Sequence, residues 1–565
     1  MSQLKSCALV AAASALICGN ATAQNDQWSG NSSRNINDPL NWSLGVPNNT
    51  KWMEFSPAWS TGPFGGLLDM NGGGSTLGMK VDASGGTGGN IVINGPHVLT
   101  LGTDGIDMNQ ADNSAISVAT INAPLVLGAV QTWLITNSTL SVTGVISGGS
   151  ALTITGSGGA RSVTFGAHNT YSGGTTINNV SLTLANDHGL GTGSVTANNS
   201  TLTFQSFNPV LNNPVLNAST ATFTNLGGQP TLNNPTMTNG SVVDFSASGS
   251  PSIVDMVSDA MGSGNNIVLG AGTTLQIQVD SPATQYYGTI STIGPPGGSL
   301  NVSTGGPSGE LDLYGANTYS NGTTVQANVV LIAGNNSALG SGPVTLNTDG
   351  NLAVAPGVTI TNQLTLQDDS GLGGYGTIAP ASPETITIKN FTAVSGGIGT
   401  LGSAAGYPVP GTLTFSNNVS LVFGKDGLLQ FSIMNAGGVA GTDYSAINAS
   451  NSSLNITATP GHQFTIQLIS VDPGTGQAGL ANFNNSTAYS WTLISASSIT
   501  NYDPTYFFVD SGSLFQNALG GGIFSVSEFG NNLMLNFTPV PEPSTWALMA
   551  SGLCAIGAAV RRRRR

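Results

Sequence analysis

Two carboxylates, two residues apart, are the first candidates for chemistry in this 565-residue chain. Glu310 and Asp312 stand in a short segment that alternates polar with apolar residues, which predicts a strand with both carboxylates on one face. Glycoside hydrolases use two carboxylates about 5–9 Å apart. A solvated strand face without catalytic function is the simpler interpretation of the pair. The catalytic interpretation and the solvated-face interpretation both stay open. Asp368 and Asp369 are a weaker pair, because neighbours on a strand face opposite ways.

The histidines do not have the spacing of metal ligands. They are His97, His168, His188 and His462. His168 and His188 are 20 residues apart, about one step of the shorter internal repeat described below, so their rings could stack. We interpret them as surface turn residues, with a metal site as the alternative. Sequence signatures for helical zinc sites, nucleophile elbows, P-loops and dinucleotide binding are missing. We therefore expect no catalytic residues, no metal centre and no cofactor. Calcium stays an alternative at three Asp-Gly turns, which begin at Asp104, Asp349 and Asp426.

The C-terminal segment, residues 540–565, indicates where the protein goes. Pro541, Glu542 and Pro543 precede an uncharged apolar run, 546–560, and the run ends in Arg561, Arg562, Arg563, Arg564 and Arg565. The prolines predict a helix start that leaves Glu542 outside on extended backbone. As a helix, the run would be about 22 Å long, short of the roughly 30 Å hydrocarbon core. We still expect one short transmembrane segment at 546–560, with the arginines as a cytoplasmic stop.

This order of motif, apolar run and basic end resembles the PEP-CTERM sorting signal of Gram-negative bacteria. The resemblance is confined to the C-terminal segment. It implies recognition by an exosortase, a membrane-embedded transpeptidase-like enzyme, followed by release or transfer to the cell surface. Pro541, Glu542 and Pro543 would then be a substrate for another enzyme. An ordinary C-terminal anchor is the alternative.

Residues 1–23 read as a secretory signal peptide. Lys5 supplies the positive start, 8–17 is an apolar core, and Ala21 and Ala23 flank Thr22 in a small-residue cleavage site for signal peptidase. The mature chain would begin at Gln24. The three cysteines, Cys7, Cys18 and Cys554, lie in the two end segments, so the exported region cannot form disulfides.

The exported region is acidic and poor in charge. Charged residues are 7% of the chain, against about 25% in average globular proteins. Residues 24–539 hold six basic and 25 acidic side chains, a net charge of −19. This excludes nucleic-acid binding, which depends on phosphate neutralisation. It also disfavours acidic polysaccharides and lyase chemistry, which needs a cation beside the abstracted proton.

Short strands and internal repeats predict the architecture. Brief segments alternate Val, Ile, Leu or Phe with Thr or Ser and are bounded by Gly, Asn or Pro. The stretch 169–177 recurs at 317–325, and 211–214 recurs at 232–235. The step of the shorter repeat fits one coil of a parallel β-helix, with Asn ladders at matching turns and Gly at positive-φ corners.

The longer repeat resembles the autotransporter-associated β-strand repeat. The matching residues are Gly166 to Thr176 and Gly315 to Thr324, with His168 and Asn321 departing from the pattern. The resemblance implies a right-handed parallel β-helix on the bacterial surface. The fold class we expect is therefore all-β, a right-handed solenoid over 66–395 with repeats near 144–204 and 305–352, followed by the short C-terminal helix.

Two flanking regions complete the expected domains. Residues 24–65 hold Trp28, Trp42, Trp52 and Trp59. We interpret them as an aromatic cap over the open end of the β-helix, with a carbohydrate-stacking platform as the alternative. Residues 396–539 are expected to be all-β, either as the last coils or as a small sandwich.

These features together predict an exported β-solenoid, non-enzymatic, which is structural or adhesive in the envelope or the exopolysaccharide matrix. Its expected location is the membrane before processing and the cell surface or medium afterwards. Extracellular polysaccharide is an expected partner. A polysaccharide lyase or glycosidase is the alternative, with Glu310 as its first residue to test.

Overall fold

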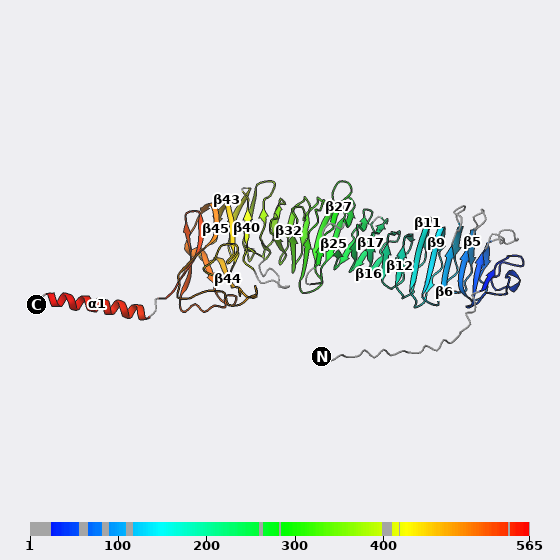
Figure 1. Cartoon of the computed structure of the whole chain (residues 1–565). Helices are drawn as coiled ribbons and strands as arrows, with labels where there is room; N and C mark the ends of the chain where they lie inside the picture. The colour runs from blue at the N-terminus through cyan, green and yellow to red at the C-terminus, as the bar shows by residue number, and fades with distance from the viewer. Residues whose placement is uncertain are drawn as a thin grey trace, which may run out of the picture.

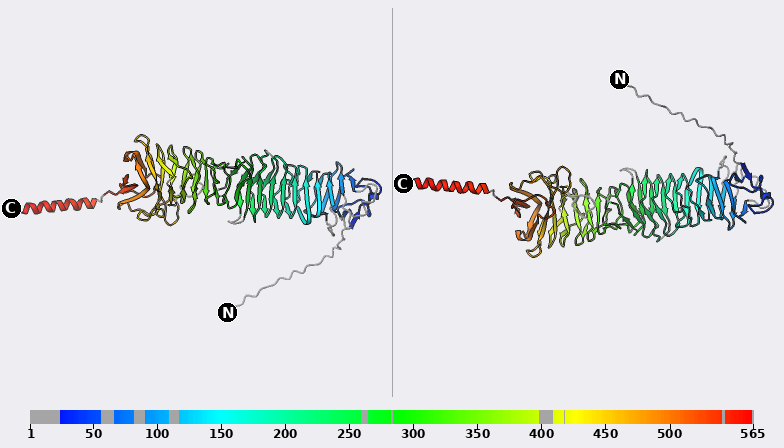
Figure 2. Two further views of the ribbon diagram at one scale, coloured as in Figure 1. Left: turned by 90° about the horizontal axis from the view of Figure 1, so that it is seen from above. Right: turned by 90° about the horizontal axis from the view of Figure 1, so that it is seen from below.

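The computed structural model describes residues 24–563 except 56–65, 82–89, 109–116, 226, 259–263, 282–283, 398–408, 417 and 541–542. The strands stack along one axis into a rod, with the first strands at one end and the helix α1 (Pro543–Arg563) beyond the other (Figure 1). Two further views show the same elongated stack (Figure 2). The predicted all-β solenoid is confirmed, and its right-handed sense stays a prediction.

Parallel ladders run along the rod as four sheets. The first sheet begins with β1 (Gln24–Gln27) and β2 (Lys51–Phe55), and its middle part contains β9 (Gln131–Val142), β11 (Leu152–Phe165), β12 (Thr175–Asn178), β13 (Ser181–Leu184), β14 (Val195–Asn198), β15 (Thr201–Phe204), β17 (Val215–Asn217), β18 (Thr220–Phe223), β20 (Thr236–Thr238), β21 (Val242–Phe245) and β24 (Asn266–Leu269). Register pairs Ser181 with Thr201 and Thr201 with Thr220, on β13, β15 and β18. In the second sheet, register pairs Leu211 with Leu232, so the recurring 211–214 segment marks one coil, as predicted.

The second sheet contains β16 (Val210–Asn212), β19 (Thr231–Asn233), β22 (Ser252–Val254), β25 (Thr274–Gln278), β28 (Ser299–Ser303), β30 (Thr323–Val325), β32 (Val344–Leu346) and β35 (Leu364–Leu366). The third contains β26 (Thr284–Tyr286), β29 (Gly309–Leu313), β31 (Val329–Ala333), β33 (Asn351–Val354), β36 (Gly371–Gly374), β39 (Ala393–Ser395), β42 (Leu428–Ile433), β44 (Phe464–Ser470) and β46 (Phe507–Asp510). The fourth contains β34 (Thr359–Ile360), β37 (Thr377–Ile378), β40 (Thr412–Phe415), β43 (Ala446–Ile456), β45 (Tyr489–Thr500), β48 (Asn532–Thr538) and β47 (Ile523–Phe529).

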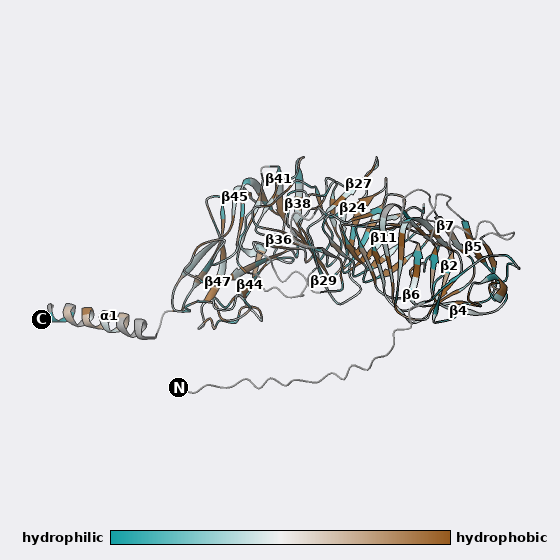
Figure 3. Ribbon diagram, turned by 45° about the vertical axis from the view of Figure 1, so that its right-hand side comes forward, coloured by the Kyte–Doolittle hydropathy of each residue, from teal (hydrophilic) through white to brown (hydrophobic). Residues whose placement is uncertain are grey.

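Inward side chains form continuous apolar columns, because parallel in-register pairing puts equivalent residues above one another. Phe204, Phe223 and Phe245 stack with ring centroids 4.6 and 5.0 Å apart. The brown stretches of the ribbon mark the apolar residues within the strands (Figure 3). The interior is not wholly apolar: Ser200, Ser219 and Ser241 are also buried. Each of the last two accepts a hydrogen bond from the backbone N–H of a residue one coil earlier.

The recurring Asn-x-Tyr segment has the same contacts in both copies. Asn169 accepts a hydrogen bond from Ile146 N (2.8 Å) and donates one to Gly189 O (2.6 Å), so its amide joins the preceding and following coils. Asn317 makes the equivalent bonds to Ile290 N (2.7 Å) and Ala338 O (2.5 Å). Two residues later a buried tyrosine shares a 2.7 Å hydrogen bond with a threonine in each copy. The repeat is thus a structural clamp between coils.

Asparagine, more than glycine, makes the corners between β12 and β13 and their equivalents. The corner residues Asn179, Asn199 and Asn239 have φ of 55°, 48° and 54°, in the left-handed region that asparagine tolerates. The prediction of glycine corners does not describe these positions, although Gly191 and Gly340 do take positive φ (68° and 65°) at other turns. The predicted ladder is confirmed beside them: Asn198 donates to Asn178 (2.9 Å), and Asn217 donates to Asn198 (3.1 Å).

Two of the N-terminal tryptophans are buried, and Trp52 is half-buried. Trp28 and Trp42 are 2% and 5% exposed and meet edge to face, with ring centroids 5.1 Å apart. Trp42 also donates its indole N–H to Ile36 O (2.7 Å). Burial of both rings fits the cap and not an open carbohydrate platform. Trp59 lies outside the described residues.

The region after 396 continues the solenoid. β37 pairs in parallel with β40, and β39 pairs in parallel with β42, across the boundary that the sequence suggested. The chain then reverses, because β48 pairs antiparallel with both β45 and β47. This favours last coils closed by a hairpin over a separate sandwich.

Candidate functional site

The carboxylates Glu310 and Asp312 lie on β29, on the outward side of the third sheet. Their side chains share a face because Leu311 between them points into the core. Register pairs Asp312 with Gln285 on β26. Asp312 is only 5% exposed. The interpretation as a solvated strand face is therefore wrong for Asp312, and Glu310 is half-buried beside it.

Polar neighbours hold one oxygen of Asp312. Gln285 Nε2 donates to Asp312 Oδ2 (3.1 Å), and Tyr314 OH donates to the same oxygen (3.4 Å). Tyr287 OH donates to Gln285 Oε1 (3.0 Å), and the rings of Tyr287 and Tyr314 stack with centroids 4.6 Å apart. Oδ1 of Asp312 is buried and accepts no hydrogen bond from any residue that the structure describes. We call Gln285, Tyr287, Glu310, Asp312 and Tyr314 the carboxyl–tyrosine cluster.

Burial and mutual repulsion alter the titration of this cluster. Partial burial, and then the nearby Asp312, raises the pKa of Glu310 to about 7. Burial also raises the pKa of Asp312, against the opposing effect of the bonds from Gln285 and Tyr314. Near neutral pH, Glu310 is thus present in both protonation states. A carboxyl group present in both states can give up or take a proton, which is the requirement of general acid–base chemistry.

Sequence reasoning found the two carboxylates and missed Gln285, Tyr287 and Tyr314. Tyr314 follows Asp312 by two positions, so the strand period alone would have placed it on the same face. The other two lie one coil earlier, and this coil is longer than the step of the 211–214 repeat. Only the observed register brings them together.

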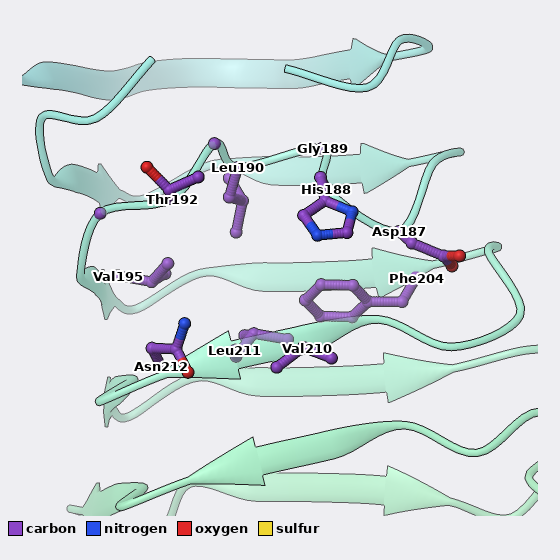
Figure 4. A pocket seen from close by; sticks show the side chains of 12 residues that line it. Asp187, His188, Gly189, Leu190, Thr192, Val195, Phe204, Val210, Leu211 and Asn212 are labelled. Atoms are coloured by element: carbon purple, nitrogen blue, oxygen red, sulfur yellow. The ribbon is translucent and has the colours of Figure 1, made fainter. Parts of the chain in front are cut away.

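The two nearest histidines stack, as their separation of one coil suggested. The rings of His168 and His188 lie 4.2 Å apart. His188 also borders a small cavity with Asp187, Phe204 and Val210, which Figure 4 shows from close by. Its volume of about 20 Å³ holds roughly one water molecule. Within the described residues, no three ligating side chains gather to hold a metal ion.

Two of the three Asp-Gly pairs, those that begin at Asp349 and Asp426, are turns at corners of the coils, whereas Asp104 and Gly105 lie inside β6 (Leu99–Met108), where the register with β4 (Gly74–Val81) shifts. Asp349 and Asp426 have φ of 58° and 55°, and Gly105 has φ of 65°. Asp349 N donates to Asp369 O (3.2 Å), one coil further on. Backbone geometry accounts for the two turns, and calcium binding at the Asp-Gly pairs stays an untested alternative.

The C-terminal segment follows directly on the closing hairpin. β48 ends at Thr538, and α1 begins at Pro543, as the proline rule predicted. The helix contains 546–560 together with Arg561, Arg562 and Arg563. Pro541, Glu542, Arg564 and Arg565 lie outside the described residues, as do Ala21 and Ala23 of the predicted cleavage site.

The expected transmembrane segment at 546–560 is not supported. Among the described residues, no helix combines the length and the apolar character that crossing a membrane requires. The physical reason is that α1 opens with Pro, Ser and Thr and closes with arginines, which leaves an uncharged stretch of about 22 Å for a core of about 30 Å.

Residues 539–565 match the family model described as the PEP-CTERM protein-sorting motif. No curated protein and no solved structure matches the chain significantly. The sorting motif implies an exported protein, sorted at the membrane and processed by an exosortase. These comparisons do not show the autotransporter-associated repeat, which stays a prediction.

Proposed function

We propose that this protein is a structural or adhesive rod of the cell envelope or the exopolysaccharide matrix, which its C-terminal motif delivers to the cell surface. The observation that supports it most is the pairing of a sorting motif with a continuous solenoid. In the solenoid, backbone ladders satisfy the main chain and few charges are needed. Adhesion then depends on a neutral or weakly polar partner, because the exported region carries a net charge of −19.

Replacement of Pro541, Glu542 and Pro543 by alanine tests the sorting step. We expect the variant to accumulate with an uncleaved C-terminus and to be depleted from the cell surface, because the exosortase no longer recognises its substrate. Mass spectrometry of the C-terminal peptide and surface biotinylation measure the two effects. Alanine at Asn484, Asn485 and Ser486, in a mostly exposed turn, is the control. Normal processing of the motif variant would contradict this assignment.

The matrix role has a separate test. The exported protein should co-sediment with extracellular matrix from its own cells, and cells that lack it should form a matrix with less cohesion. Rheology of the matrix with and without the gene measures the second effect. Correct sorting with no change in cohesion and no co-sedimentation would refute the structural role while leaving the sorting assignment intact.

A second candidate function is action on a polysaccharide at the carboxyl–tyrosine cluster. One observation favours it: Glu310 has a pKa of about 7 beside the buried Asp312, a property of many general acids. Turnover of bacterial polysaccharides that is lost in Glu310→Gln and retained in Glu528→Gln would support an enzyme. Absence of turnover across neutral and acidic polysaccharides would leave the rod as the function.

A further inference from the structure

One outward face of the first sheet carries a regular array of hydroxyl groups. It lies on β9, β11, β13, β15 and β18, where each strand presents two Ser or Thr side chains that flank one inward apolar residue. The first column is Thr139, Ser162, Ser181, Thr201 and Thr220, and the second is Ser141, Thr164, Thr183, Thr203 and Thr222. We call these ten residues the hydroxyl face.

The hydroxyls of this face have no partner inside the part of the protein that the structure describes. None of the ten side chains makes a hydrogen bond there, whereas the neighbouring Asn178, Asn198 and Asn217 bond to one another along the rod. All ten are half-buried or exposed, so their hydroxyls are available to solvent. None is charged. Beyond β18 the pattern ends, with Val242 and Asp244 at the equivalent positions of β21.

The spacing along each column is set by the backbone. Strands in a sheet lie about 4.7–4.9 Å apart, so equivalent hydroxyls repeat at that distance over five rungs. Water molecules joined by hydrogen bonds of about 2.75 Å in a tetrahedral network have second neighbours about 4.5 Å apart. The two periods differ by about 0.3 Å per rung, an offset that reaches only about 1.2 Å over the four steps of a column.

We propose that the hydroxyl face binds ice. Threonine presents a methyl and a hydroxyl group together, so the methyl groups order the nearest waters while the hydroxyls join the same network. Each contact is weak, but ten contacts on a rigid backbone act together. The ligand is a neutral lattice, which suits a face without charge on a chain that is otherwise acidic.

A polysaccharide chain is less well suited to this face. Saccharide and other small-molecule sites are concave and use aromatic rings with a few directed polar groups. The ten residues of the hydroxyl face include no aromatic, amide or carboxylate side chain.

The offset between the strand spacing and the water spacing indicates a modest activity toward ice. Such activity is better seen as inhibition of ice recrystallisation than as a large depression of the freezing point.

Partition of the exported protein into slowly growing ice tests this proposal. We expect the wild-type protein to be enriched in the ice and to slow recrystallisation. The double variant Thr183→Tyr/Thr203→Tyr, which places two rings in the middle of one column, should lose about tenfold or more of that enrichment. Thr324→Tyr/Thr345→Tyr is the matched control, because these two threonines also face outward on paired neighbouring rungs, β30 and β32 of the second sheet.

Circular dichroism and urea unfolding establish whether each variant is folded. If Thr183→Tyr/Thr203→Tyr does not fold, the variant Thr183→Lys/Thr203→Lys is used in its place. Wild-type protein that is excluded from ice would overturn the proposal. An equal loss in the control pair would overturn it as well, as would binding to insoluble neutral glucan without enrichment in ice. None of these results affects C-terminal processing, which is measured on a separate segment.

Discussion

Single amides hold successive coils together. Asn169 and Asn317 are buried in the two copies of the repeat, and each satisfies one backbone N–H and one backbone C=O on different coils. Buried backbone groups without partners are costly. The recurrence of this residue in both copies therefore has a physical cause that does not involve a ligand.

Replacement of Asn317 by leucine should destabilise the rod by roughly 2–4 kcal/mol, because Ile290 N and Ala338 O would both lose a buried partner. Urea unfolding measures this change in the free energy of unfolding. Asn321→Leu, at an exposed position of the same segment, should change it by less than about 0.5 kcal/mol. Equal effects of the two variants would show that the amide is not a clamp.

Glu310 should make stability fall as pH rises. Its pKa is about 7 in the folded protein and 4.5 as its ordinary value, so the folded state holds the proton more tightly between these limits. The contribution of Glu310 to stability is therefore largest below about pH 4.5. It declines by about 1–2 kcal/mol up to about pH 7, after allowance for solvent screening, and is level above.

Urea unfolding of wild type and Glu310→Gln from pH 4.5 to 8 checks this. The variant lacks the titrating group, so its stability should depend less on pH over that interval, and it should be the more stable protein at pH 8. Glu528→Gln, on the exposed side of β47, should keep the wild-type slope. If the free energy of unfolding of the wild type rose with pH between 4.5 and 8, with the same slope as that of Glu310→Gln, the raised pKa of Glu310 would be contradicted.

At the scale of elements, the closing hairpin covers β45, the last parallel strand of the fourth sheet. β48 covers the edge of β45 and is itself covered by β47. An uncovered strand edge is a template for pairing with another chain. The sorting segment begins after Thr538, so cleavage near 541–543 would leave both hairpin strands in place.

Truncation after Leu519 should therefore cause self-association through β45, whereas truncation after Val540 should leave a monomer. Size-exclusion chromatography with light scattering distinguishes the two. The longer product retains β47 and β48 and is the matched control. Monomeric behaviour of both products would show that the hairpin is not needed to cover the edge.

The sequence predicted these elements unevenly, for physical reasons. Coil length and the asparagine ladder follow from local period and repeat spacing, which a single sequence displays. The carboxyl–tyrosine cluster does not, because it depends on a longer coil whose length is set by its loops. Glycine takes positive φ at other turns, such as Gly191 and Gly340, but the corners between β12 and β13 and their equivalents are made by asparagine, because asparagine reaches the same φ values. The predicted membrane segment, 546–560, is too short to cross a membrane. As a helix it is about 22 Å long, against a hydrocarbon core of about 30 Å, and this difference was already evident from the sequence.

At the scale of the whole molecule, the rod should be visible in solution. A compact protein of about 516 residues has a radius of gyration near 24 Å. The exported region should exceed this clearly, because its strands stack along a single axis. Small-angle X-ray scattering measures it, and a radius of gyration equal to that of the compact protein would contradict the extended stack.

The aromatic cap and the sorting segment lie at opposite ends of one uniform stack (Figure 1). A gain or loss of one entire coil would therefore move the cap by about 4.8 Å without altering either terminus. The length of the rod can therefore change by duplication or deletion of short gene segments that encode entire coils. The sorting segment and the N-terminal cap would stay the same.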